Sequence, residues 1–172
     1  MTEVAVSRRQ FLRGDVRGSR AGIRPPWALP EAAFTAQCTR CDDCVTACPD
    51  SLIVHGSGGY PEIDFRRGAC TFCRKCVDAC RAAALQAGPV GSHAAWAHRA
   101  VIGAGCLAAN GVVCRACGDH CQAGAIRFRL APGGRSFAQV ALARCTGCGA
   151  CAGVCPVGAV VMQVPAPAEA AA

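Results

Sequence analysis

Apolar residues are spread thinly along this chain, and the clearest periodic patterns are two short alternations. In the first, the apolar run 52–54 passes through a Gly-rich turn into an alternation of acidic and apolar residues over 62–65. In the second, apolar residues alternate with arginines over 126–130, and apolar residues return over 137–142 after a Pro-Gly-Gly turn. Alternation of this kind is typical of strands with one buried face. The pattern therefore predicts two small β-hairpins.

The remaining apolar content comes mostly from small residues, so hydrophobic burial is a weak source of stability here. The 172 residues include only six Phe, two Trp and one Tyr, beside 20 Gly and 16 Cys. A chain of this length forms one domain or two small ones, and small domains often depend on metals or disulfides. Because bonds between ligand and metal form only in the folded state, we expect metal ligation to supply folding energy.

A disulfide framework would need an oxidising compartment, and therefore an export signal. The run 7–12 looks like a twin-arginine signal core, but charged residues and Gly follow it where an apolar h-region would be needed. These charges, with Pro25 and Pro26, exclude a membrane span there, and the uncharged stretches 100–114 and 145–168 are interrupted by Gly, Pro and Cys. We therefore expect a soluble, cytoplasmic chain without a transmembrane segment.

The formal net charge of +7 raises the question of a nucleic-acid partner. That charge counts every Cys as neutral, and thiolates around positively charged cluster cores would largely cancel it. The basic surplus that remains lies in the N-terminal arm, which carries no nucleic-acid-binding motif, so we expect no nucleic-acid partner. The arginines of the arm are Arg8, Arg9, Arg13, Arg17, Arg20 and Arg24.

The cysteines fall into four segments that can be laid over one another. In the first, second and fourth segments, consecutive cysteines are separated by two, two and three residues. The third segment opens with a gap of seven residues instead. Such internal repetition indicates two related halves. The segments are Cys38-Cys41-Cys44-Cys48, Cys70-Cys73-Cys76-Cys80, Cys106-Cys114-Cys117-Cys121 and Cys145-Cys148-Cys151-Cys155.

This spacing indicates iron–sulfur clusters of the cubane [4Fe–4S] type. Three cysteines at i, i+3 and i+6 place their thiolates on three corners of one cube. In the two-cluster ferredoxin arrangement, the fourth thiolate comes from the partner segment. Applied to this chain, the arrangement predicts four clusters on four crossed sets of ligands. These are Cys38, Cys41, Cys44 and Cys80 (site 1); Cys70, Cys73, Cys76 and Cys48 (site 2); Cys106, Cys114, Cys117 and Cys155 (site 3); and Cys145, Cys148, Cys151 and Cys121 (site 4).

Zinc is the main alternative, because Cys-x2-Cys pairs are also its signature. A tetrahedral zinc site needs two such pairs with a loop between them, whereas each regular segment crowds four thiolates together, which suits a cube. The third segment is less regular, so a looser or non-cubane site stays open there. His120 is expected in solvent or beside a ligand. With no nucleophile–base pair or phosphate loop, we expect no enzyme activity.

These patterns predict an α+β fold built from two bacterial dicluster-ferredoxin-like modules, in which short helices and small β-hairpins surround the clusters. We expect a basic, extended N-terminal arm (1–35), a first module (36–88), a linker (89–104), a second module (105–165) and a disordered tail (166–172). Because the apolar core is thin, most ordered structure should be lost without iron.

Several features together resemble the NapF family, the ferredoxin-type proteins of the periplasmic nitrate reductase system. The likeness spans nearly the whole chain and lies in the run 7–14, the stretch 24–30, the start of the first segment at 37–41, and the wide gap between Cys106 and Cys114. The resemblance implies a cytoplasmic accessory protein that contacts the catalytic molybdopterin subunit before export and assists its maturation, including by electron delivery. It also implies a twin-arginine-like run that does not lead to export.

Two other functions stay open on the residues alone. A freestanding polyferredoxin electron carrier would use the clusters as a short wire, with the basic arm steering it to an acidic partner. A sensor of oxygen or iron supply would use cluster loss as its signal. The arm is either a docking element or a solvated, flexible segment.

Overall fold

The computed structural model describes residues 22–88 and 95–165; residues 1–21 of the expected arm, part of the expected linker and the expected tail lie outside them. The first half contains α2 (Glu31–Gln37), α3 (Asp43–Ala47), β1 (Ile53–His55), η1 (Ser57–Gly59), β2 (Pro61–Ile63) and α4 (Lys75–Asp78). The second half contains β3 (Arg99–Ile102), η2 (Ala108–Asn110), α5 (Ala116–Asp119), β4 (Ile126–Ala131), β5 (Arg135–Val140), α6 (Ala150–Gly153) and β6 (Val160–Gln163).

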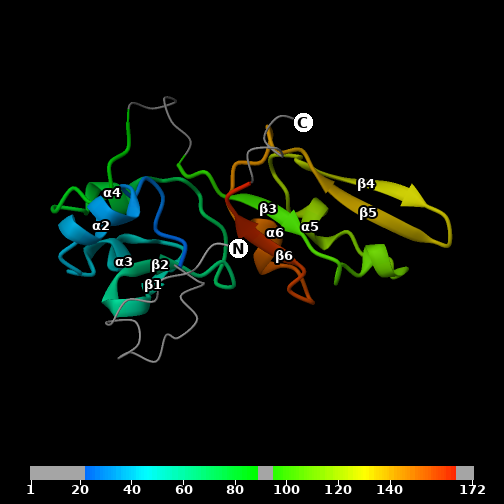
Figure 1. Cartoon of the computed structure of the whole chain (residues 1–172), viewed down its shortest axis with the longest axis horizontal. Coiled ribbons are helices and arrows are strands. Elements are labelled where there is room, and N and C mark those ends of the chain that lie inside the picture. The colour runs from blue at the N-terminus through cyan, green and yellow to red at the C-terminus, as the bar shows by residue number, and fades with distance from the viewer. Residues whose placement is uncertain (1–21, 89–94, 166–172) are drawn as a thin grey trace, which may run out of the picture.

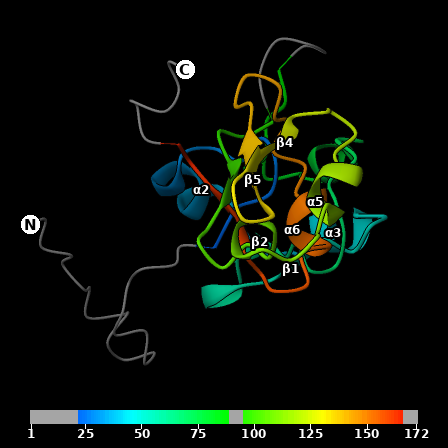
Figure 2. The ribbon, with the colours of Figure 1, turned by 90° about the vertical axis from the view of Figure 1, so that its right-hand side faces the viewer.

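The two halves lie end to end. Figure 1 shows α2, α3, α4 and the β1–β2 hairpin toward one end of the long axis and the β4–β5 hairpin at the other. Figure 2 looks along this axis, with the second half in front of the first. The short helices and small sheets match the α+β, dicluster-ferredoxin-like fold expected from the sequence.

Both hairpins expected from the alternation are present. β1 pairs antiparallel with β2, with Ile53 opposite Ile63, and β4 pairs antiparallel with β5, with Ile126 opposite Val140. In β4, Ile126 is buried and Phe128 is partly buried, whereas Arg127 and Arg129 are exposed. The alternation predicted the buried face only near the start of β4, because Leu130 is 92% exposed and Phe137 of β5 is also exposed.

The third sheet, β3 with β6, was not expected. β3 lies in the segment 89–104, which was expected to be a linker, and it pairs antiparallel with a strand near residue 160, with Ile102 opposite Val160. The two strands are far apart in the sequence, and each is only four residues long. A short run with no turn to its partner carries no local signal of pairing, which is why the segment was interpreted as a linker.

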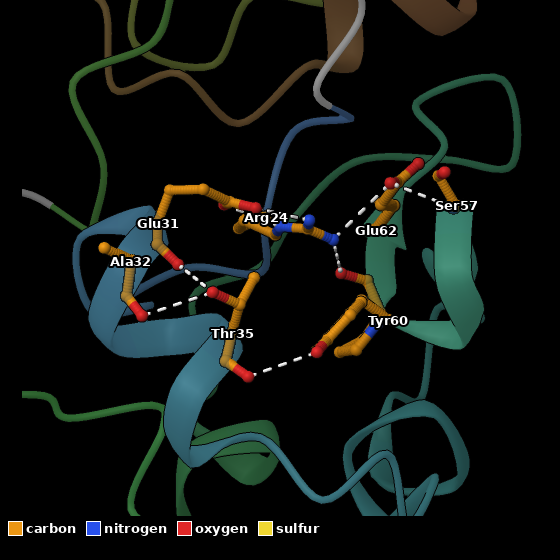
Figure 3. A network of polar contacts seen from close by, with 8 residues as sticks. Arg24, Glu31, Ala32, Thr35, Ser57, Tyr60 and Glu62 are labelled. Carbon is orange, nitrogen blue, oxygen red and sulfur yellow. Dashed lines mark hydrogen bonds and ion pairs between the residues drawn. The ribbon is translucent and has the colours of Figure 1, made fainter. Parts of the chain in front are cut away.

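The described part of the expected arm is packed against the first half. α2 crosses the expected boundary at residue 35, and its Phe34 is fully buried. The N–H of Ile63 donates to the carbonyl of Ile23 at 2.7 Å, so the chain near residue 23 runs along β2. Arg24 reaches from this segment to both α2 and β2 (Figure 3). An extended, basic arm was expected over 1–35, but apolar burial holds its last part against the first half.

Three buried clusters hold the described residues together. One surrounds Phe34 in the first half, and another surrounds Ile126 in the second. The third has Leu52, Phe65 and Trp96 at its centre, and side chains from both halves pack against it. Cysteines pack into all three clusters. Apolar burial and cysteine placement are therefore coupled, as expected for a small fold organised around ligands.

Candidate metal centres

The cysteines line four cavities in the described part of the chain, four cysteines to each cavity. The four cavities are similar in size and partly open to solvent. Every cysteine is a free thiol, so none is used in a disulfide. The sets brought together are Cys38, Cys41, Cys44 and Cys80; Cys48, Cys70, Cys73 and Cys76; Cys106, Cys114, Cys117 and Cys155; and Cys121, Cys145, Cys148 and Cys151. These groupings coincide with sites 1 to 4, although their ligation of clusters stays a prediction.

The thiols of each set surround a space and do not converge on a point. Among the described residues, no three Cys, His, Asp or Glu side chains lie close enough to hold a single metal ion. A tetrahedral zinc ion needs all its thiolate sulfurs about 2.3 Å away from it. Four thiols arranged around a cavity suit a polynuclear core, whose corners separate the ligands. His120 is exposed and lines none of the four cavities; its Nδ1 lies 3.0 Å from the Ala116 carbonyl oxygen.

The short helices place ligands of one segment in two different cavities. The third Cys of every segment lies inside a helix, and the fourth follows that helix. In α3, for example, Cys44 lines site 1, while Cys48 at its C-terminal end lines site 2. Because α3 packs against α4 and α5 packs against α6, each half brings two segments close enough to exchange their fourth cysteines. Helix packing thus explains why each cavity is lined by cysteines of two segments.

The loops between the cysteines repeat one backbone conformation in the three regular segments. The second residue after the first Cys and the residue after the second Cys both have positive φ. Left-handed residues in short loops help to turn backbone N–H groups toward one side, where they can form a concave binding site for anions. Side chains other than Gly, Asn and Asp rarely adopt this conformation, so it is strained at several of these positions. The positions are Arg40 and Asp42, Phe72 and Arg74, and Gly147 and Gly149.

Every segment also has a left-handed residue three positions after its fourth Cys. In the second half, the next N–H donates to that cysteine: Ala125 to Cys121 Sγ at 3.3 Å, and Ala159 to Cys155 Sγ at 3.2 Å. Donors to sulfur stabilise a thiolate and help to set the potential of a cluster bound to it. Sequence reasoning missed these positions, although glycines at equal places in aligned segments were a usable signal. The residues are Ser51, Ala83, Gly124 and Gly158.

The irregular third segment reaches its cavity by a different route. The seven-residue gap contains the short helix η2. Asn110 Nδ2, at its end, donates to the carbonyl oxygens of Ala104 and Cys106 at 2.9 and 2.8 Å. This turn brings Cys106 into the cavity that Cys114 also lines. Arg115 has an extended φ of −133°, so the repeated left-handed position is absent here. The structure therefore assembles site 3 without the loop conformation of the other sites.

The thiols of each set lie close together and most are at least partly buried, so burial and mutual repulsion disfavour their charged thiolate forms. Burial, aided by neighbouring thiolates, raises the pKa of Cys44 to about 11 and that of Cys76 and Cys151 to about 12. Burial likewise raises the pKa of Cys70 to about 11. Thiolates so placed need a cationic core between them to be stable. The donor set therefore fits a cluster that binds thiolates and supplies one-electron chemistry.

Cys155 differs from the other thiols. Its partial burial raises the pKa, but hydrogen bonds from the backbone N–H groups of Val157, Ala159 and neighbouring residues outweigh burial and hold the pKa below its usual value. The backbone donors thus favour the thiolate form of one thiol of site 3.

Two stretches of the chain match models of the 4Fe-4S dicluster domain, at residues 27–85 and 112–159. The first stretch begins inside the expected arm, in agreement with its packing. The second begins after Cys106 and leaves the irregular start of the third segment outside. The ferredoxin-type protein NapF of Haemophilus influenzae is 41% identical to the chain over 95% of its length and 97% of the relative.

The chain belongs to the NapF family of ferredoxin-type proteins. The NapF of Escherichia coli K12 is 40% identical over 94% of this chain and 96% of its own. The methylamine utilization ferredoxin-type protein MauM of Methylorubrum extorquens is 33% identical over 83% of this chain and 71% of its own. No solved structure matches the chain.

NapF membership and the two dicluster matches make this a ferredoxin-type iron–sulfur protein that carries [4Fe–4S] clusters. Within residues 22–88 and 95–165, no helix has the length and apolar character needed to cross a membrane.

Proposed function

We propose that this NapF-type chain is a cytoplasmic accessory protein of the periplasmic nitrate reductase system. In this proposal it holds four [4Fe–4S] clusters at sites 1 to 4, contacts the catalytic molybdopterin subunit before export, and assists its maturation by delivering electrons. One observation carries the proposal: four cavities of similar volume, each lined by one of the crossed sets of four cysteines. The family membership supplies the link to the nitrate reductase system.

The roles of the residues follow from the geometry of each cavity. Four thiolates would hold each cluster, and the cluster would supply reversible one-electron transfer. The N–H groups behind Cys121 and Cys155 would raise the potentials of the clusters at sites 4 and 3, because they stabilise negative charge on sulfur. Electron delivery needs no substrate pocket and no proton-transfer group, in agreement with a role as an accessory protein rather than an enzyme.

Cluster content tests the first part of this proposal. Anaerobically purified chain should contain about 16 iron and 16 sulfide per molecule, with EPR signals of [4Fe–4S] clusters after reduction. A chain with Cys106→Ala and Cys114→Ala should lose about a quarter of both. Iron that stays near zero after anaerobic reconstitution would contradict the proposal, and an unchanged content in the double variant would remove site 3 from it.

Partner binding tests the second part. The chain, used as bait in an anaerobic cytoplasmic extract, should retain the unexported precursor of the catalytic subunit. A truncation that removes residues 1–21 keeps the Arg24 contacts, so it separates docking by the arm from stability of the first half. A full chain with all its clusters that recovers no molybdoenzyme precursor would count against the maturation role.

A freestanding electron carrier is a second candidate, and one observation favours it. Cys41 of site 1 and Cys73 of site 2 are exposed, whereas the other cysteines are buried or half-buried. Exposed ligands let a cluster approach a passing partner closely. A carrier of this kind should reduce a purified acceptor rapidly, and more slowly at high salt. Absence of reduction with every redox partner tried would eliminate this candidate.

A further inference from the structure

The two halves meet through the backbone of two cysteines. The N–H of Cys70 donates to the carbonyl oxygen of Cys148 at 2.8 Å. Cys70 lines the cavity of site 2, and Cys148 lines the cavity of site 4. One hydrogen bond therefore joins a residue of a candidate centre in the first half to a residue of a candidate centre in the second.

Aromatic side chains enclose this contact, which we call the junction. Trp96 Nε1 donates to the carbonyl of Gly147 at 3.0 Å, beside Cys148. The Trp96 ring stands edge-on to the rings of Phe65 and Phe72, at 5.7 and 6.1 Å between centroids. Trp96 and Phe65 are each only 9% exposed. The junction is thus largely shielded from water and held by directional contacts, which limits relative motion of the halves.

Two glycines allow the halves to approach this closely. A Cβ on Gly149 would overlap the Phe65 ring, and a Cβ on Gly153 would lie 2.6 Å from the Phe65 carbonyl oxygen. Gly149 also has a φ of +83°, so it has a conformational reason to be Gly. No such reason applies at Gly153, where the approach of Phe65 is the visible constraint. Gly153 therefore positions the two halves.

Within each half, the crossed ligands already connect two sites. Cys44 of site 1 and Cys48 of site 2 lie in and directly after α3. In the second half, Cys117 of site 3 and Cys121 of site 4 have the same relation to α5. The junction adds the missing link between site 2 and site 4. The sites therefore form a row in the order 1, 2, 4, 3, which differs from their order along the chain.

We infer that the Cys70–Cys148 contact is the electron-transfer junction between the two halves and that electrons move along the sites in the order 1, 2, 4, 3. With clusters bound, one electron would pass from a reduced centre on one side, which would be oxidised, to the centre on the other side, which would be reduced by that same electron, with no bond made or broken and no proton moved. Tunnelling weakens steeply with distance, and a hydrogen bond between ligand residues couples two centres better than a gap does. The inference rests on the proposed clusters at the four sites.

Magnetic coupling gives a test that does not depend on any partner. An inner-pair chain keeps only sites 2 and 4, through Cys38→Ala, Cys41→Ala, Cys106→Ala and Cys114→Ala. An outer-pair chain keeps only sites 1 and 3, through Cys73→Ala, Cys76→Ala, Cys145→Ala and Cys151→Ala. After full reduction, the inner pair should give an EPR spectrum split or broadened by spin–spin coupling, whereas the outer pair should give the plain sum of two clusters. A plain sum from an inner-pair chain with two full clusters would overturn the inference.

A glycine variant ties the coupling to the junction. Gly153→Leu in the inner-pair chain should abolish the coupling while iron and sulfide stay at two clusters. Gly105→Leu is the matched control, because the nearest atom to its Cβ, that of Ala159, lies 4.0 Å away, outside the junction. Coupling that survives Gly153→Leu would contradict the role given to the junction.

If the multiple-Cys variants do not fold, Gly153→Leu and Gly105→Leu can be compared in the chain that keeps all 16 cysteines. There, Gly153→Leu should slow the spin relaxation of the reduced clusters and Gly105→Leu should not; equal relaxation in both would overturn the inference. Iron quantitation keeps the two hypotheses apart. Missing iron contradicts the proposed sites, whereas full iron without coupling contradicts the junction.

Discussion

Arg24 and Glu31 form a two-point ion pair. Arg24 Nε donates to Glu31 Oε2 at 2.9 Å, and Nη2 donates to Oε1 at 2.7 Å. The third nitrogen, Nη1, lies 3.4 Å from Glu62 Oε1, and the guanidinium stands over the rings of Phe34 and Tyr60 at 5.2 and 5.4 Å. Figure 3 shows how this side chain joins α2 to β2. Arg24 therefore belongs to the folded first half, unlike a residue of a free arm.

Arg24→Ala should destabilise the first half by about 1–2 kcal/mol. Glu31 is half-exposed, so solvent limits the ion pair to about 0.5–1 kcal/mol, and the lost ring contacts add about as much. Arg24→Lys should recover only part of this, because an ammonium cannot make the fork. Anaerobic denaturant unfolding measures the effect. Arg66→Ala is the control, since Arg66 is exposed and pairs only locally with Asp64 and should show no measurable change.

Cys80→Ala should remove the cluster of site 1 and leave that of site 2 largely intact. The reason is the crossing: Cys80 lies in the second segment but lines the cavity with Cys38, Cys41 and Cys44. Iron content should fall by about a quarter, and EPR should identify the lost signal. Cys48→Ala is the reciprocal control and should remove site 2 instead. Equal loss of both clusters in each variant would be evidence against the crossed assignment.

Acid should release the cluster of site 2 before that of site 3. Burial holds the pKa of Cys70 near 11 and that of Cys76 near 12, so protons compete with iron for these sulfurs at a higher pH. At site 3, burial raises the pKa of Cys117, but backbone N–H groups lower that of Cys155, so this one thiol is protonated only at a lower pH. As the pH falls from neutral under anaerobic conditions, Cys114→Ala, which keeps sites 1, 2 and 4, should therefore complete its loss of visible absorbance at a higher pH than Cys73→Ala, which keeps site 3 in place of site 2. The reverse order would show that thiol pKa does not control cluster loss.

Removal of iron should abolish most of the ordered structure. The apolar clusters are small and incorporate cysteines such as Cys76, Cys117 and Cys151. Without clusters, the free energy of ligation is lost and buried thiols face one another across empty cavities. Far-UV circular dichroism of the anaerobically reconstituted chain, before and after chelation, measures the loss. A sample kept anaerobic without chelator is the control, and a spectrum unchanged by complete iron removal would refute the prediction.

The residues alone were sufficient for the features that arise locally. A run such as Cys38-Thr39-Arg40-Cys41 brings its thiols together whatever surrounds it, so the spacing predicted the clusters that the dicluster matches support. Alternation around Phe128 predicted a hairpin because both strands and their turn are contiguous. The exchange of Cys48 and Cys80 was predicted by applying the two-cluster ferredoxin arrangement, and the structure places both thiols in the expected cavities.

Tertiary structure alone decided the features that join distant segments. The pairing of β3 with β6, the packing of Arg24 and the contact of Cys70 with Cys148 each connect residues with no shared local pattern. Their free energy comes from burial and hydrogen bonds that exist only once both halves are folded. The sequence by itself thus predicted the [4Fe–4S] clusters and indicated which cysteines would hold them. The order inferred for the four sites depends on how the two halves pack around Phe65 and Trp96, which only the tertiary structure shows.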